Sequence, residues 1–300
     1  MIQRIKRSIV LLKEGRLIKQ LFFRVKTFFY LLFSRQKNHY FDHMEIQGKS
    51  ESSFILNYKG KKNFGVRLPL FEVNENNKLI LPQNTKRVMI DVGTSVGWIN
   101  SIEYLNQNPD DSVVIGIEPN IDSWLVSKGI HVFNEKNDIK YVSKFSKNSS
   151  SRIIFLPVAL APYEGFAKFY GHDKLGTSSL LDSAFETTNS TVVPTIKLSQ
   201  VIELVPDNIE YIEILKIDAE GFDLQILKSG GQYLSRVALV TVECVNGHLF
   251  KSGYKSKEIY DFLESNNFKV IPNSKIFGTD SFINLKFEKE LPNIKFRVES

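Results

Sequence analysis

The sequence predicts an α/β fold in which a mostly parallel sheet is covered by helices on both faces. Of the 300 residues, 42% are hydrophobic and 24% are charged, which is the composition of a globular protein rather than of a disordered or collagen-like chain. From residue 87 onward, apolar runs of strand length alternate with stretches of helical pattern, as in parallel sheets. Several of these runs end in glycine or acidic residues, and ligands of such proteins bind at the carboxyl ends of the strands.

The expected elements follow this alternation in order. Predominantly apolar runs of this length indicate buried strands. Strands are expected over Val88–Val92, Val113–Ile117, Ile153–Ala161, Phe166–Tyr170, Ile212–Ile217, Val237–Val245, Lys269–Ile271 and Phe282–Phe287. The spacing of apolar residues predicts helices over Val96–Asn106, from about Asp122, over Phe222–Leu227 and over Lys257–Glu264.

A small β segment is expected before the sheet. Phe54–Tyr58 and Phe64–Leu68 flank a turn-forming segment, Lys59–Asn63, and this pattern predicts a β-hairpin. Lys78–Leu81 is expected to add a short strand. We therefore divide the chain into an N-terminal arm, a connector with a hairpin, and a main domain, at residues 1–41, 42–86 and 87–300.

Most of the positive charge lies in the N-terminal arm. Residues 1–41 hold ten Lys and Arg and one Glu, a net charge of +9, whereas the rest of the chain holds 29 basic and 32 acidic residues and carries −3. Within residues 2–33, apolar side chains recur at steps of three and four between the basic ones, which predicts a basic amphipathic helix. Its longest apolar run, Phe28–Phe33, is six residues long, against about 20 for a helix that spans a membrane.

We expect this helix to lie on an anionic membrane surface, where apolar burial and the attraction of Lys and Arg act together. The alternatives are packing against the body or a partner protein, and a nucleic-acid arm, which the dense Phe and Leu face disfavours. The segment lacks the long apolar run and small-residue cleavage site of a signal peptide. The single cysteine, Cys244, excludes an intramolecular disulfide and suits a reducing compartment. We therefore expect a cytoplasmic protein at the inner face of the membrane.

The first candidate for a ligand site is the turn from Asp91 to Gly97, which leaves a strand and opens a helix. Gly93 and Gly97 allow a tight turn and close approach of a ligand to the backbone, and the helix N-terminus offers unpaired N–H groups. Thr94 and Ser95 place small polar side chains between the glycines. The third glycine of the dinucleotide pattern is absent, so the turn alone is weak evidence for NAD or FAD.

The second candidate is Glu118, which ends the next strand and is followed by Pro119 and Asn120. A carboxylate in this place can accept hydrogen bonds from both hydroxyls of a ribose. An acid is also favoured near a helix N-terminus by the helix dipole alone. Taken with the glycine turn, Glu118 favours a ligand that contains a nucleoside.

The third candidate follows the apolar run Ile212–Ile217. Lys216, Asp218 and Glu220 lie at the end of this run, beside Gly221. Charges at the end of a buried strand are costly unless they are paired or used in a reaction. We expect them at the same sheet edge as the first two candidates.

Together these segments resemble the FkbM family of S-adenosylmethionine-dependent methyltransferases over about residues 88–285. The motifs that carry the resemblance are Asp91-Val92-Gly93 with Gly97, Glu118-Pro119-Asn120, Gly176-Thr177-Ser178-Ser179-Leu180 and Lys216-Ile217-Asp218-Ala219-Glu220-Gly221. The resemblance implies a Rossmann-like methyltransferase fold and methyl transfer, usually to a hydroxyl of a sugar, glycan or polyketide. It implies that the turn holds the amino-acid end of the cofactor and that Glu118 holds its ribose.

Three positions depart from the family pattern. Thr94 and Ser95 stand where the family usually has Ala and Asn, and both are small enough to keep the turn. Leu198-Ser199 stands where the family often has Leu-Asp, which removes an acid. The departures leave the cofactor-binding candidates as Asp91, Gly93, Thr94, Ser95, Gly97, Glu118, Pro119 and Asn120.

Methyl transfer to a hydroxyl requires that one proton be removed from the hydroxyl. A general base can accept this proton, or a bound metal ion can assist its loss. Asp218 is our first choice as the base, with Lys216 as its ion-pair partner. Glu243 and His248, which lie at the end of the run Val237–Val245 and in the loop after it, are further candidates. No spacing in the sequence demands a metal ion. The expected acceptor is a small molecule or glycan with a hydroxyl, and no nucleic acid is expected.

Two other functions are compatible with parts of the pattern. Gly93-Thr94-Ser95-Val96-Gly97 also fits the Gly-x-Ser-x-Gly turn of serine hydrolases, with Asp218 and His248 in hydrolase order. A hydrolase would leave Glu118 and the Lys216–Gly221 segment without a role. A non-catalytic, membrane-associated scaffold that retains the cofactor pocket is the other alternative, since Ser199 replaces an acid of the family pattern.

Overall fold

The computed structural model describes residues 56–58, 61–64, 72–95, 98–120, 151–171, 178–181, 189–244, 254–276 and 279–294. The chain divides into two compact units, Met1–Met44 and Glu45–Ser300, and all described residues belong to the second. Four expectations lie outside the described residues: the amphipathic helix over residues 2–33, the helix from Asp122, and the placement of Gly97 and His248.

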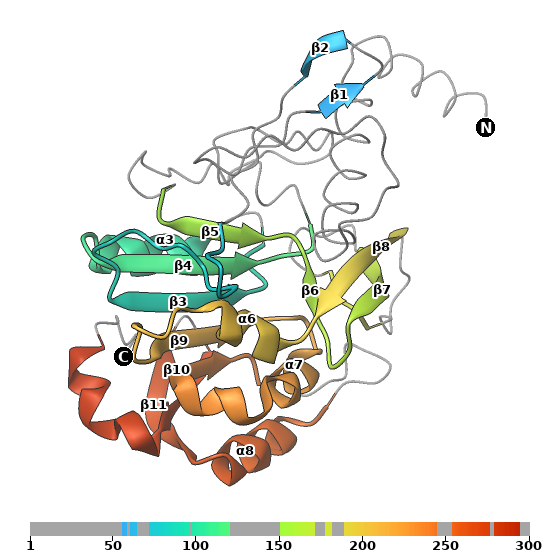
Figure 1. Ribbon diagram of the computed structural model, residues 1–300. Helices are drawn as coiled ribbons and strands as arrows, with labels where there is room; N and C mark the ends of the chain where they lie inside the picture. Colours follow the sequence, from blue (N-terminus) through green and yellow to red (C-terminus); the bar gives the residue numbers. More distant parts are fainter. Residues whose placement is uncertain are drawn as a thin grey trace. The chain divides into compact units, whose positions relative to one another are not determined.

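The main sheet of the described chain has seven strands in the order β11-β12-β10-β9-β3-β4-β5 (Figure 1). Strands β5, β4, β3, β9 and β10 pair in parallel, whereas β12 runs antiparallel to β10 and β11. This is the doubly wound order of nucleotide-binding sheets with one antiparallel strand inserted before the outer strand, so the predicted α/β fold is confirmed. The strands are β3 (Arg87–Val92), β4 (Ser112–Ile117), β5 (Ile153–Leu156), β9 (Ile212–Ile217), β10 (Val237–Val242), β11 (Phe268–Ile276) and β12 (Thr279–Asn284).

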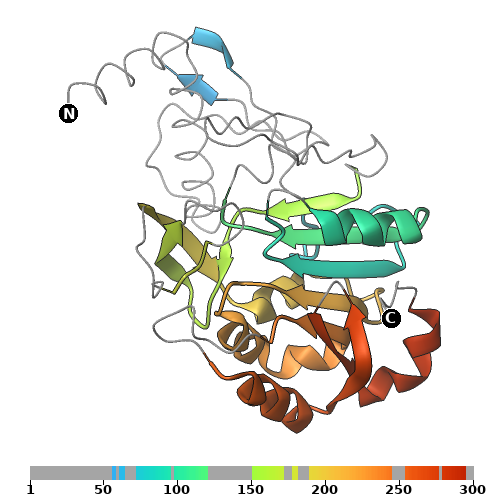
Figure 2. The same ribbon diagram turned by 180° about the vertical axis from the view of Figure 1, so that it is seen from behind.

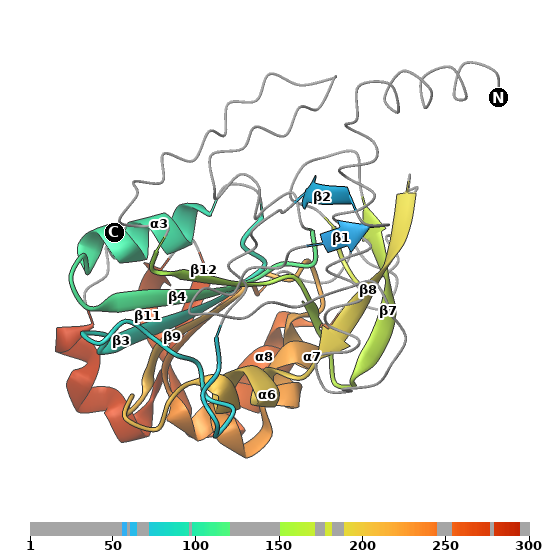
Figure 3. The same ribbon diagram turned by 45° about the horizontal axis from the view of Figure 1, so that its top comes forward.

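Helices cover both faces of this sheet. Helix α3 lies on one face, and α6, α7 and α8 lie on the other (Figures 2 and 3). Every residue of β4, β9 and β10 is buried, because the helices exclude water from both sides. None of the described helices has the length and apolarity needed to cross a membrane. The helices are α3 (Ile99–Gln107), α6 (Leu198–Leu204), α7 (Asp223–Gly230) and α8 (Ser256–Ser265), with 3-10 helices at Gly231–Arg236 and Leu285–Asn293.

A second, three-stranded sheet lies beside the carboxyl ends of the main strands (Figures 1 and 3). It consists of β6 (Ala159–Leu160), β8 (Asn189–Ile196) and β7 (Gly165–Gly171). The prediction of one strand over Ile153–Ala161 was wrong: the chain leaves the main sheet at Leu156, passes Pro157 and enters the small sheet at Ala159. Proline has no N–H to donate to a sheet, which explains the break there.

Strand β8 and helix α6 were not predicted from the sequence, and other predicted elements differ in their bounds. The last predicted strand, Phe282–Phe287, lies at Thr279–Asn284 and is followed by a 3-10 helix. The hairpin is present as β1 (Leu56–Tyr58) and β2 (Lys61–Phe64), so its connection is shorter than predicted. The expected strand near Lys78–Leu81 is an isolated bridge between Val73 and Leu79.

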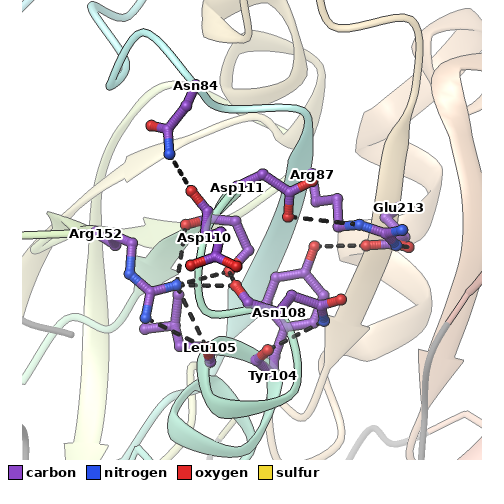
Figure 4. Close-up of polar contacts among 10 residues, drawn as sticks. Asn84, Arg87, Tyr104, Leu105, Asn108, Asp110, Asp111, Arg152 and Glu213 are labelled. Atoms are coloured by element: carbon purple, nitrogen blue, oxygen red, sulfur yellow. Dashed lines mark hydrogen bonds and ion pairs between the residues drawn. The ribbon is translucent and has the colours of Figure 1, made fainter. Parts of the chain in front are cut away.

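The amino ends of the main strands hold a set of paired charges (Figure 4). Arg87, at the start of β3, donates to Glu213 in β9 and lies 3.6 Å from Asp111. The hydroxyl of Tyr104 in α3 donates to the second oxygen of Glu213 at 2.7 Å. Arg152 donates to the carbonyls of Leu105 and Asn108 near the end of α3, at 3.3 and 3.0 Å. These contacts tie α3 to the sheet at the edge away from the candidate site.

Candidate active site

A buried ion-pair group lies where β3 and β9 end side by side. Asp91 pairs in register with Lys216, and the Lys216 Nζ lies 3.4 Å from Asp91 Oδ1 and 3.2 Å from Asp218 Oδ2. The side chains of Asp91 and Lys216 are 1% and 2% exposed, whereas that of Asp218 is 36% exposed. Burial alone would lower the pKa of Lys216, but the charges of Asp91 and Asp218 outweigh it and raise that pKa. Lys216 is therefore a permanent cation that cannot accept a proton at neutral pH.

The glycine turn follows β3 directly and packs against the end of β9. Gly93 has a φ of +76°, and a Cβ on it would lie 1.9 Å from the backbone oxygen of Asp218. Its N–H donates to the carbonyl of Ile117 at the end of β4, 2.9 Å away. Only glycine fits this position, so the turn lies tightly between the ends of β4 and β9.

Glu118 closes the other side of this turn. Its two carboxylate oxygens accept hydrogen bonds from the N–H groups of Ser95, at 3.2 Å, and of Asn120, at 2.8 Å. A carboxylate oxygen can accept a second hydrogen bond, so both oxygens retain acceptor capacity. Burial raises the pKa of Glu118 to about 7, although the two backbone N–H groups act against this. The carboxyl group thus titrates near neutral pH.

Trp98 is part of this site and was not among the predicted site residues. It precedes α3 with a φ of 50°, is fully buried, and lies 5.7 Å from the ring of Phe155. A Cβ on Gly116 in β4 would lie 2.2 Å from its ring. The glycine inside an otherwise apolar strand was the signal in the sequence, because such a residue marks close approach of another group.

Three acidic side chains gather at the ends of β9 and β10. Asp218 and Glu220 follow β9, and Glu243 follows β10, with its N–H donating to Ile217 O at 3.2 Å. Burial, followed by the charge of Asp218, raises the pKa of Glu220 to about 8 and that of Glu243 to about 7. The charges of Asp223 add to both effects. The pKa values of Glu220 and Glu243 therefore lie near neutral pH, as is common for carboxyl groups at functional sites.

The segment that carries Asp218 and Glu220 is held by a further buried acid, Asp223. Asp223 is the first residue of α7 and is fully buried. Its carboxylate accepts from the N–H groups of Ala219 and Gly221, at 2.9 and 3.1 Å, and from the hydroxyl of Tyr254 at 2.9 Å. Neither Asp223 nor Tyr254 was predicted as a site residue, although Asp223 lies only two positions after the predicted Lys216–Gly221 segment.

The structure brings most predicted residues to one sheet edge. The residues from β3, β4, β9 and β10 that lie there are Asp91, Gly93, Thr94, Ser95, Glu118, Pro119, Asn120, Lys216, Asp218 and Glu243. Their roles in binding and catalysis stay predictions. Among the described residues, no group of three or more His, Cys, Asp or Glu side chains is arranged to hold a metal ion.

The polar atoms at this edge suit a ligand with a ribose and a cationic amino-acid end. Glu118 retains acceptor capacity on both oxygens, next to the glycine turn. Asp91 accepts from Ser101 at 2.5 Å through Oδ2, and its buried Oδ1 faces the Lys216 ammonium 3.4 Å away. A carboxylate oxygen can accept more than one hydrogen bond, so Oδ1 can also accept from a bound amino group.

Comparisons with known proteins bear on this site. Two solved methyltransferase structures share weak similarity with the chain: a mutant of the 16S rRNA (adenine(1408)-N(1))-methyltransferase with cosubstrate SAM from Catenulisporales acidiphilia, and the antibiotic-resistance methyltransferase Kmr. The first has 8% identity and a TM-score of 0.32 over 71% of this chain and 94% of its own. The second has 11% identity and a TM-score of 0.29 over 70% and 96%. No curated protein sequence matches the chain.

The family comparison is decisive. The family model described as methyltransferase FkbM domain matches residues 91–270, which include the glycine turn, Glu118 and the Lys216–Gly221 segment. This match favours methyl transfer over the serine-hydrolase interpretation of Ser95. The chain therefore belongs to the FkbM methyltransferase family, whose cofactor is S-adenosylmethionine.

Proposed function

We propose that the protein transfers a methyl group to the oxygen of a hydroxyl-bearing acceptor, such as a sugar, a glycan or another small molecule. The observation that supports this is the acidic group of Asp218, Glu220 and Glu243, which lies after β9 and β10 at the same sheet edge as the cofactor turn after β3. A hydroxyl must lose a proton when it is methylated, and a base works best when its pKa lies near the working pH. The pKa of Glu243, raised to about 7, meets this condition.

In the proposed arrangement the turn from Asp91 to Ser95 would hold the cofactor. Glu118 would accept hydrogen bonds from its two ribose hydroxyls, and Asp91 would accept from the amino group of its methionine end. Bound S-adenosylmethionine supplies an electrophilic methyl group on its sulfonium. The protein holds the acceptor oxygen in line with that methyl carbon, which lowers the entropic part of the barrier.

The proposed transfer requires a group that accepts the proton of the acceptor hydroxyl. The bond between the acceptor oxygen and the methyl carbon forms as the carbon–sulfur bond breaks, and the hydroxyl proton passes to the carboxylate of Asp218 or Glu243. The products are a methyl ether, S-adenosylhomocysteine and a protonated carboxyl group. Lys216 stays protonated throughout and orients Asp218, 3.2 Å away.

The first test is calorimetric titration of the purified protein with S-adenosylhomocysteine. We expect micromolar binding, and Glu118→Ala is expected to weaken it by one to two orders of magnitude, about 1.4–2.8 kcal/mol, because two hydrogen bonds to a charged group are lost. Asp218→Asn is expected to leave this affinity within about twofold of wild type. No binding by the folded wild type would contradict the proposed site.

The second test measures turnover with radiolabelled S-adenosylmethionine and a panel of sugars, nucleotide sugars and matched amines. We expect label in a hydroxyl-bearing acceptor and a reduction of at least about a hundredfold in Asp218→Asn or in Glu243→Gln, whichever variant lacks the group that takes the proton. Transfer to an amine would contradict the oxygen acceptor. Cofactor binding without turnover on any acceptor would favour the scaffold alternative.

We also propose that residues 2–33 bind an anionic membrane surface. The support is the sequence of the segment, with its +9 charge over residues 1–41 and its apolar stripe. Full-length protein should sediment with vesicles that contain phosphatidylglycerol and stay in the supernatant with phosphatidylcholine alone. A variant without residues 1–35 should bind S-adenosylhomocysteine but not the vesicles. Retained vesicle binding would contradict this role, and an unfolded variant would show that the arm packs on the body.

A further inference from the structure

The acidic segment after β9 has an unusual backbone. Glu220 has a φ of 50° and Gly221 a φ of 87°, so two successive residues are in the left-handed region. A residue other than glycine in this region costs of order 1–2 kcal/mol and persists only when its surroundings hold it there. The conformation of Glu220 therefore requires contacts from outside the segment.

The first such contact is the hydroxyl of Tyr254, which precedes α8. This hydroxyl lies 2.9 Å from Asp223 Oδ2 and 2.8 Å from the carbonyl oxygen of Glu243. Asp223 in turn accepts from the N–H groups on either side of Glu220. One phenol oxygen thus joins the segment after β9 to the segment after β10, and Tyr254 is 9% exposed.

The second contact comes from the small sheet. The hydroxyl of Ser179 donates to the carbonyl oxygen of Glu220 at 2.8 Å and accepts from the N–H of Leu181 at 3.0 Å. The backbone of Ser179 is bonded to Tyr170 of β7 in both directions, at 2.8 and 3.0 Å. The inserted sheet is therefore connected to the acidic segment through one buried side chain, which is 1% exposed.

From these contacts we propose that the hydroxyls of Tyr254 and Ser179 are positioning groups for methyl transfer, which hold Glu220 and Glu243 beside Asp218. Tyr254 acts through Asp223 and the Glu243 carbonyl, and Ser179 acts through the Glu220 carbonyl. This proposal rests on the proposed function, which assigns the reaction to the three acids. The contacts above add Tyr254 and Ser179, which lie outside the sheet edge, to the residues of the site.

The pKa values of Glu220 and Glu243 report on the surroundings of their carboxylates and can be measured without a methyl acceptor. The ionisable groups around Glu220 are Asp218, Glu243, Asp223 and Lys216, and all but Lys216 raise its pKa. If either hydroxyl is removed, Glu220 is expected to relax toward water and away from these acids, and its pKa falls. The measurement is a carbon-13 NMR titration of protein labelled at the Glu carboxyl carbons, with Glu220→Gln and Glu243→Gln to assign the two resonances.

In wild type we expect midpoints near 8 for Glu220 and near 7 for Glu243. In Tyr254→Phe we expect both to fall by at least about half a pH unit, and in Ser179→Ala we expect this of Glu220, since half a unit is a threefold change in a protonation equilibrium. The affinity for S-adenosylhomocysteine should stay within about twofold in both variants. The two substitutions act on different sides of the segment. If one variant does not fold, the other still tests the hydroxyl that it removes.

Tyr104→Phe is the matched control, because it removes a hydroxyl from a buried carboxylate at the opposite sheet edge. It should lower the melting temperature without moving either midpoint. A midpoint that stays within about 0.2 pH units of wild type would overturn the role of the hydroxyl removed, and would identify that contact as structural only. Because no acceptor is used, this result does not depend on whether the acceptor atom is oxygen.

Discussion

The two ends of strand β9 hold buried charges in different ways. At the amino end, the carboxylate of Glu213 accepts from Arg87 on one oxygen and from Tyr104 on the other (Figure 4). At the carboxyl end, Lys216 faces Asp91 and Asp218, and its charge also acts on Glu220 and Glu243. The first end pairs its charges, whereas the second has an excess of acids.

The pKa shifts at the two ends show the same difference. Burial raises the pKa of Glu213, but Tyr104 and Arg87 both act to lower it. Burial also raises the pKa of Glu220, and there the next three contributions, from Asp218, Glu243 and Asp223, raise it further. Acids that repel each other reduce the stability of the fold, so their retention at one edge indicates a use in binding or catalysis.

The largest expected effect is that of Lys216→Met. Removal of one partner of a buried pair leaves Asp91 uncompensated, which typically costs about 3–5 kcal/mol. Arg87→Met at the other end should cost less, because the Arg87 side chain is 26% exposed and Tyr104 still donates to Glu213. Urea unfolding of both variants at pH 7 measures the difference. Equal losses would show that the two ends depend equally on their cation.

Gly93→Ala should have the next largest effect. A left-handed alanine costs about 1–2 kcal/mol, and a Cβ placed 1.9 Å from the Asp218 carbonyl oxygen adds about 1–3 kcal/mol of overpacking. Thermal unfolding of Gly93→Ala beside wild type measures the sum, which should exceed the cost of a left-handed alanine alone. A loss of no more than about 1–2 kcal/mol would mean that the turn can move away from β9.

The sequence predicted the residues at the carboxyl ends of the strands better than the residues that hold them in place. Runs such as Ile212–Ile217 were placed to the residue, because strands buried on both faces are predominantly apolar. The pairing of Lys216 with Asp218 followed from the cost of burying either charge. Ser179 lay in a recognised motif, but nothing in its neighbours along the chain indicates a bond to Glu220, which is 41 positions away.

The same limit explains what was missed elsewhere. Tyr254 reaches Asp223 over 31 positions, and Tyr104 reaches Glu213 over 109, so only the fold brings these pairs together. Trp98 could have been anticipated from Gly116, since a glycine within a buried strand indicates close approach of another group. The periodicity of apolar residues predicts which face of a helix or strand is buried. It does not predict which distant residue a buried polar side chain will bond.

A smaller effect is expected from pH on cofactor binding. Free protein holds Glu118 with a pKa of about 7, and a ribose is bound best by the ionised carboxylate. Binding should therefore release a proton, and the affinity for S-adenosylhomocysteine should rise about tenfold from pH 6 to pH 8. Calorimetry in two buffers of different ionisation enthalpy measures the proton release. Glu118→Gln should bind more weakly with no such rise, and an unchanged pH dependence in this variant would assign the titration to another group.

Tyr104→Phe should have the smallest effect, and it tests whether the amino end is only structural. The loss of one hydrogen bond to a buried carboxylate costs about 1 kcal/mol when another donor remains, as Arg87 does here. The site lies at the other end of the same strands, so the affinity for S-adenosylhomocysteine should be unchanged at pH 7. Urea unfolding and calorimetry on the same preparation measure both quantities. If the affinity falls together with the stability, α3 transmits strain from Tyr104 to Trp98 and the glycine turn, and the two ends of the sheet do not act independently.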